Sequence, residues 1–123
     1  MEVRALAQAV ALSRTVFGVA MLAVPTRVGA GWIGPTGEGA PASVLSRSVA
    51  ARDIGLGLGA LAATRDGGGE AWFAAHALAD ATDLLGTLAA RDSLPAGGVK
   101  GTVALAGGSM LACAACAVAL ARD

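Results

Sequence analysis

Seven ionisable side chains stand inside apolar stretches of the sequence, where such groups are costly and need partners. They are Arg14, Arg47, Arg52, Asp53, His76, Asp80 and Asp83. Three are arginines and three are aspartates, so the set can neutralise itself through ion pairs. Charges of this kind form either a paired structural lock or a polar site for protons, ions or ligands.

The spacing in the third apolar stretch places its polar residues on one face of a helix. They recur at intervals of four, three and four positions, as His76, Asp80, Asp83 and Thr87. In the second stretch, Arg52 lies at a similar depth. Because a guanidinium group binds a carboxylate through two parallel hydrogen bonds, we predict that Arg52 pairs with Asp80 or Asp83.

Other candidate chemistry is weaker. Cys113 and Cys116 form a C-x-x-C, but they lie deep in an apolar segment instead of at a helix start, where the dipole activates a thiol. His76 is the only histidine, so bis-histidine haem ligation within one chain is excluded, and we interpret it as a hydrogen-bonded member of the polar stripe. We predict no metal site and no cofactor, and enzymatic activity is the weakest of the alternatives.

Glycine- and proline-rich segments divide the chain into four apolar stretches, and these stretches carry the ionisable residues. We predict helices over about 2–24, 42–64, 70–90 and 97–120, with a Gly/Pro-rich loop over 29–41. Each helix has about 21 to 24 residues, close to the ~20 that cross ~30 Å of hydrocarbon. The prediction is therefore an all-α fold: one domain, residues 1–123, forming an antiparallel up-down bundle of four transmembrane helices.

Composition favours a membrane protein over a soluble bundle. Charged residues make up 15% of the chain, apolar residues 55%, and the mean hydropathy is +0.66. A soluble helix needs a wide polar face, yet residues 101–121 contain no charge. Nine basic and nine acidic residues leave no net charge and no basic patch, so nucleic-acid binding is excluded.

The energy of membrane insertion differs between the outer and the inner helices. Arg52 and Asp53 together cost ~5 to 7 kcal/mol at a helix centre, which the apolar residues of 42–64 barely offset. The stretch 70–90 carries Asp80 and Asp83 and is no better. We therefore predict that 2–24, a retained first span, and 97–120 anchor the protein in lipid, whereas 42–64 and 70–90 need each other.

Three segments together resemble a known kind of protein. Ser13–Gly18, Ser46–Gly57 and Ala79–Asp83 are similar to segments of small four-helix membrane proteins of GC-rich, actinobacterial-type bacteria. The resemblance implies the fold and a multi-pass location in the bacterial plasma membrane. It implies no activity and no cofactor.

Two functional hypotheses follow. The first is a structural or accessory membrane subunit, in contact with the bilayer and forming a homo-oligomer or part of a larger complex, in which the charges lock the helices together. The alternative is a small transporter or channel component that uses the same charges as a proton, ion or ligand site. A fully balanced set of charges favours the lock.

Overall fold

The computed structural model describes residues 2–123, and these are almost entirely helical, with no strand in the described range. The four long helices are α1 (Val3–Ala23), α3 (Ala40–Arg65), α4 (Glu70–Ala89) and α5 (Ala96–Leu120). A short helix, α2 (Pro25–Ile33), and two 3₁₀ turns, η1 (Pro35–Glu38) and η2 (Arg91–Ser93), lie in the connections. The predicted all-α class is confirmed.

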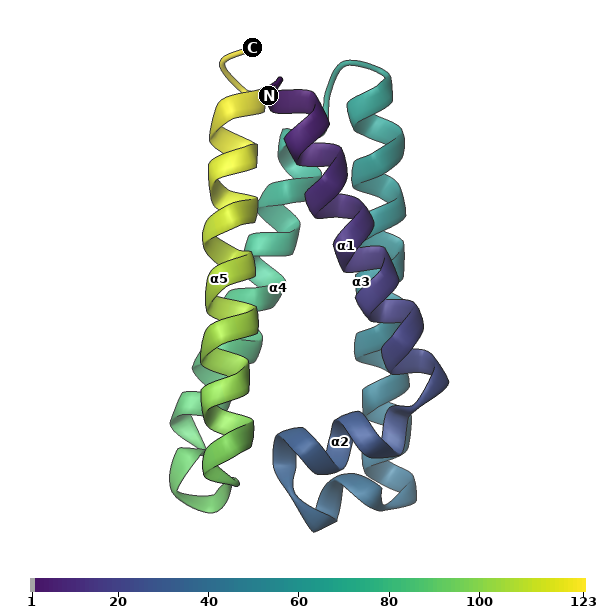
Figure 1. The fold of residues 1–123 in the computed structure, drawn as a ribbon, viewed down its shortest axis with the longest axis vertical. Helices are drawn as coiled ribbons and strands as arrows, with labels where there is room; N and C mark the ends of the chain where they lie inside the picture. Colours follow the sequence, from purple (N-terminus) through teal and green to yellow (C-terminus); the bar gives the residue numbers. More distant parts are fainter. Residues whose placement is uncertain (1) are drawn as a thin grey trace.

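The long helices run in alternating directions and form two pairs, α1 with α3 and α4 with α5 (Figure 1). The pairs approach each other at the end that holds the α3–α4 connection. They diverge towards the opposite end, where α2 crosses the base of the molecule (Figure 1). The N-terminal and C-terminal residues of the described range lie at the same end of the bundle as the α3–α4 connection. There, Arg4 Nη2 is 3.0 Å from Asp123 Oδ2.

Glycines allow α1 and α3 to pack at close range. A Cβ atom on Gly18 would lie 2.8 Å from Ile54 Cγ1 and 2.9 Å from the Ala50 carbonyl oxygen, so only glycine fits. Gly57 of α3 similarly faces Thr15 and the backbone of α1. Small residues bring backbones together in this way in membrane helices, where close packing replaces hydrophobic burial as the driving force.

The connection between the first two long helices differs from the prediction. Residues 29–33 were expected in a loop but belong to α2, which starts at Pro25 and ends at Gly34, whose φ is +84°. Proline ends α1 because its ring cannot continue that helix, yet it suits the first turn of a new one. The sequence pattern therefore marked a break correctly but missed the helix that follows it.

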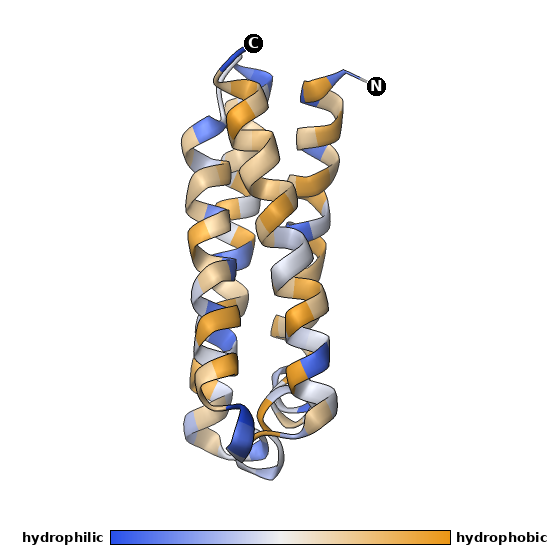
Figure 2. Ribbon diagram, turned by 90° about the vertical axis from the view of Figure 1, so that its left-hand side faces the viewer, coloured by the Kyte–Doolittle hydropathy of each residue, from blue (hydrophilic) through white to orange (hydrophobic). Residues whose placement is uncertain are grey.

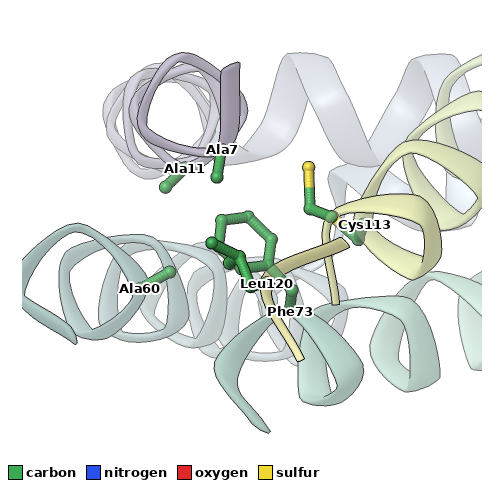
Figure 3. Close-up of a cluster of buried hydrophobic side chains, with 7 residues drawn as sticks. Ala7, Ala11, Ala60, Phe73, Cys113 and Leu120 are labelled. Atoms are coloured by element: carbon green, nitrogen blue, oxygen red, sulfur yellow. The ribbon is translucent and has the colours of Figure 1, made fainter. Parts of the chain in front are cut away.

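The apolar core is small and lies towards the end that holds the α3–α4 connection. It consists of Ala7, Ala11, Ala60, Phe73, Cys113, Cys116 and Leu120. Phe73 and Leu120 fill the space between alanines of α1 and α3 (Figure 3). Among the described residues, Phe73 and Met21 are the only large apolar side chains that are fully buried, and Leu120 is 7% exposed.

The outer surface carries most of the large apolar side chains. Eighteen of them are exposed, spread over all four long helices, and apolar residues predominate along the helices in Figure 2. Within the described residues two helices, α1 and α5, are long and apolar enough to cross a membrane. The molecule thus exposes many large apolar side chains, whereas three charged side chains, Arg14, Asp53 and Asp80, are buried.

Candidate functional site

Five of the seven predicted site residues come together between the two helix pairs. We call this group the Arg/Asp cluster: Arg14 of α1, Arg52 and Asp53 of α3, and Asp80 and Asp83 of α4. Asp53 and Asp80 are 2% and 1% exposed, so they are enclosed by protein. The predicted common depth of these helix midpoints is therefore realised as direct contact.

Arg14 connects three helices. Its Nη2 atom lies 3.2 Å from Asp53 Oδ1 and donates a hydrogen bond to it. The same nitrogen lies 2.7 Å from Asp80 Oδ1. Gly18, one turn along α1, brings α1 close enough to α3 for this reach. Arg14 therefore joins the α1–α3 pair to α4.

Arg52 makes the second connection between the pairs. Its Nη1 and Nη2 atoms donate to the two oxygens of Asp83 at 3.1 and 2.7 Å, which is the two-pronged geometry favoured by guanidinium groups. Its Nε and Nη2 atoms also donate to Asp53 Oδ1 at 3.2 and 3.0 Å. The predicted pairing of Arg52 with a carboxylate of the third stretch is present.

Arg47 lies outside the cluster. It is exposed and donates a hydrogen bond to the neighbouring Ser43 hydroxyl at 2.8 Å. Position 47 is five residues from position 52, which turns it by about 140° around a helix of 3.6 residues per turn. The predicted balance of three arginines against three aspartates is therefore wrong: two guanidinium groups meet three carboxylates, leaving one negative charge.

Asp80 is the member of the cluster whose hydrogen-bonding capacity is least used. No Arg14 N–H group is aimed at Oδ1 despite the short distance, and neither carboxylate oxygen has a hydrogen-bond partner among the described residues. The Ser109 side chain of α5 lies close to the carboxylate. Buried carboxylates normally accept several hydrogen bonds, so this one is open to a further partner.

His76 lies one turn from Asp80 but outside the ion-pair network. It is fully buried against Phe73, with the two ring centroids 6.4 Å apart. Neither ring nitrogen has a hydrogen-bond partner among the described residues. The expectation of a hydrogen-bonded His76 is not met. The last residue of the predicted stripe, Thr87, does have a partner: its hydroxyl accepts a hydrogen bond from Trp32 Nε1 at 2.9 Å.

A cavity of about 440 Å³ lies between the helix pairs, with the Arg/Asp cluster on its wall. Arg14, Asp53, Asp80 and Asp83 line it together with Ser13, Thr102 and Ser109. The rest of the lining is apolar or glycine, and includes Phe17, Met21, Trp32, Val49 and Leu105. This volume lies within the usual range for small-molecule sites, which combine apolar walls with few polar groups.

The glycines that open this cavity were not identified from the sequence. A Cβ atom on Gly31, Gly97 or Gly101 would meet no neighbour within 4 Å, although all three residues line the cavity. Their small size therefore leaves space instead of allowing close contact. The recurrence of glycine at 97, 98 and 101, in the first turns of α5, was the available signal.

The two cysteines are free thiols and both are buried. Cys113 belongs to the apolar core, and its Sγ atom lies 4.0 Å from the Ser109 hydroxyl. The described residues contain no group of three or more His, Cys, Asp or Glu side chains arranged to hold a metal ion.

Comparison of the chain with protein-family models, with curated proteins and with solved structures gave no match. Clues to the function therefore come from the Arg/Asp cluster, the cavity and the apolar surface.

Proposed function

We propose that this chain is a four-span membrane protein that binds a small solute or ion in the cavity between its helix pairs, as a small transporter or channel component. The four spans are α1, α3, α4 and α5. The exposed large apolar side chains on all four helices support contact with lipid. On the strength of the resemblance in its sequence, we propose the bacterial plasma membrane as its location.

Helices α3 and α4 carry four of the five residues of the Arg/Asp cluster, and these side chains lie between the helix pairs. Arg52 and Asp53 are costly to an isolated span, but here Arg52 pairs with Asp53 and with Asp83 of α4. We expect α3 alone to insert poorly into a membrane and the α3–α4 hairpin to insert well. Glycosylation mapping of the two segments measures this, and equal insertion of both would contradict the membrane placement of the pair.

The unbalanced cluster on the cavity wall is the observation that favours solute binding. A lock needs every buried charge to be paired and hydrogen-bonded within the protein, whereas both carboxylate oxygens of Asp80, a residue of the cavity wall, lack a hydrogen-bond partner. Ionisable residues that face a cavity inside a membrane protein mark paths and sites for ions or ligands. A proton or a cation is the species that this remaining negative charge attracts.

Flux through reconstituted protein tests the proposal. Liposomes containing the protein and an internal pH indicator are given a potassium diffusion potential, and the rate of acidification is compared with that of empty liposomes. We expect wild type and Arg47→Gln to conduct and Asp80→Asn to lose most of the flux. Wild-type protein that neither conducts protons or small cations above the rate of empty liposomes nor binds an organic solute overturns the proposal.

A structural or accessory subunit is the second candidate, because Arg14 and Arg52 hold the two helix pairs together. Breaking a buried ion pair on one side costs about 3 to 5 kcal/mol, whereas replacing both partners by apolar residues is often neutral. If the cluster serves only this purpose, Arg52→Met combined with Asp83→Leu recovers most of the stability that Asp83→Asn loses. Full retention of function in that double variant favours the subunit over the transporter.

A further inference from the structure

The walls of the cavity differ in a way that selects for one class of ligand. One wall carries the Arg/Asp cluster, in which three carboxylates meet two guanidinium groups and both oxygens of Asp80 lack a hydrogen-bond partner. The remaining walls carry large apolar side chains, among them Phe17, Met21 and Trp32. A hydrated metal ion would leave those apolar walls in contact with water, and an anion would meet an excess of carboxylates.

We propose that the cavity binds a hydrophobic organic monocation, an ammonium-type group carrying an apolar or aromatic body. This inference rests on the proposed solute-binding function and names its ligand class. The cationic head lies against Asp80, and the body lies against Phe17, Met21 and Trp32. These side chains suit such a body because small-molecule sites are lined mainly by apolar and aromatic groups.

The size of the cavity agrees with this class. About 440 Å³ accommodates a head group together with a ring or a short alkyl chain, in the usual range for drug-sized ligands. The positions around the body are shaped by Gly31, Gly97 and Gly101, where side chains are absent. These glycines provide a way to fill the site without touching the charges.

Two probes of equal shape separate charge from apolar contact. Benzyltrimethylammonium is a cation, and neopentylbenzene is its neutral isostere, with carbon in place of nitrogen. Both are added to detergent-purified protein, and affinity is measured from the ligand-dependent rise in melting temperature. We expect the cation to bind at least about tenfold more tightly than the neutral isostere, and Asp80→Asn to remove this preference.

Two variants on α5 distinguish a loss of binding from a loss of folding. Gly101→Leu fills the cavity and is expected to abolish binding of the cation while the protein keeps its melting temperature. Gly108→Leu adds the same side chain on the same helix, at a position that is open but outside the cavity, and binding persists. Arg47→Gln, which removes a charge outside the cluster, leaves the affinity unchanged.

The outcomes distinguish the ligand class from the broader function. Equal affinity for the two probes, or cation binding that survives Asp80→Asn or Gly101→Leu, overturns the organic-cation proposal. Proton or metal-ion flux that depends on Asp80 in protein that binds neither probe overturns it too, but supports the proposed function. Absence of both binding and flux overturns both.

Discussion

The two ends of the bundle use the same four helices in different ways. At the closed end, which holds the α3–α4 connection, Phe73 and Leu120 pack against alanines of α1 and α3. At the open end, near α2, the pairs diverge around a cavity. Helix α5 illustrates the difference, with cysteines and leucine in the core at one end and glycines at 97 and 101 at the other.

The comparison shows that side-chain size along a helix decides where neighbouring helices touch. Where α5 presents side chains, they fill the space between the pairs. Where it presents glycine, space remains, and the Arg/Asp cluster lies at the boundary of the two regions. Arg14 and Arg52 therefore hold the pairs together at the point where apolar packing between them ends.

The largest expected effect comes from removing the connection at that boundary. Arg14→Ala leaves the buried carboxylate of Asp80 without a cation and is expected to lower the free energy of unfolding by about 3 to 5 kcal/mol. Arg47→Ala, at an exposed position, is the matched control and is expected to cost less than about 0.5 kcal/mol. Denaturation in mixed micelles measures both. Equal effects would show that the cluster does not hold the pairs together.

The core of the closed end is tested next, by Phe73→Ala. In lipid the hydrophobic transfer term largely disappears, but the void left behind still costs roughly 24 cal/mol per Å³, or about 2 kcal/mol. Phe17→Ala, which enlarges an existing cavity, is expected to cost less than about 0.5 kcal/mol. Similar losses for the two phenylalanines, in the same unfolding assay, would contradict the contrast between the two ends.

The close approach of α1 and α3 is tested by Gly18→Ala. The added Cβ meets Ile54 Cγ1 at 2.8 Å and a backbone oxygen at 2.9 Å, so we expect a cost of about 1 to 2 kcal/mol from overpacking. Gly55→Ala, where a Cβ meets nothing within 4 Å, is expected to be neutral or slightly stabilising because alanine favours helix. Thermal unfolding of the two variants measures both effects. Equal melting temperatures would contradict the close packing of α1 against α3 at Gly18.

The smallest expected effect concerns the open end, where a hydrogen bond from Trp32 connects α2 to Thr87 of α4. Thr87→Val removes the acceptor of the Trp32 Nε1 hydrogen bond with little change of shape, and a loss of about 1 kcal/mol is expected. Fluorescence of Trp32, in a Trp72→Phe background, is expected to shift as the indole loses its partner. An unchanged spectrum and stability would mean that α2 is held by its backbone contacts alone.

The sequence predicted the long helices and most of the cluster because these depend on local signals. Apolar length, punctuation by proline and glycine, and the spacing of Asp80 and Asp83 are properties of single segments. Arg47 was misassigned because being in an apolar segment does not tell which face a residue occupies. The angle between Arg47 and Arg52 around the helix axis, about 140°, indicates that the two residues lie on different faces.

The cavity could not be predicted in the same way. It depends on how far the two helix pairs diverge, and that is set by contacts between distant segments. A glycine that permits contact, such as Gly18, and one that leaves space, such as Gly101, look identical in the sequence. The same limit applies to α2, because its position depends on the backbone of α5 at Gly98, which lies against the carbonyl of Trp32.

The ion pair between Arg4 and Asp123 has a consequence for the connectivity of the fold. It brings the first and last helices together at the closed end, so a short linker there would turn the chain into a closed ring. The exposed turn at Gly67, with its φ of +94° and no neighbour around its α-carbon, lies at the same end and offers a place to reopen that ring. The result is a circular permutant that begins with α4 and ends with α3. It keeps every buried ion pair while exchanging the order in which the two helix pairs leave the ribosome.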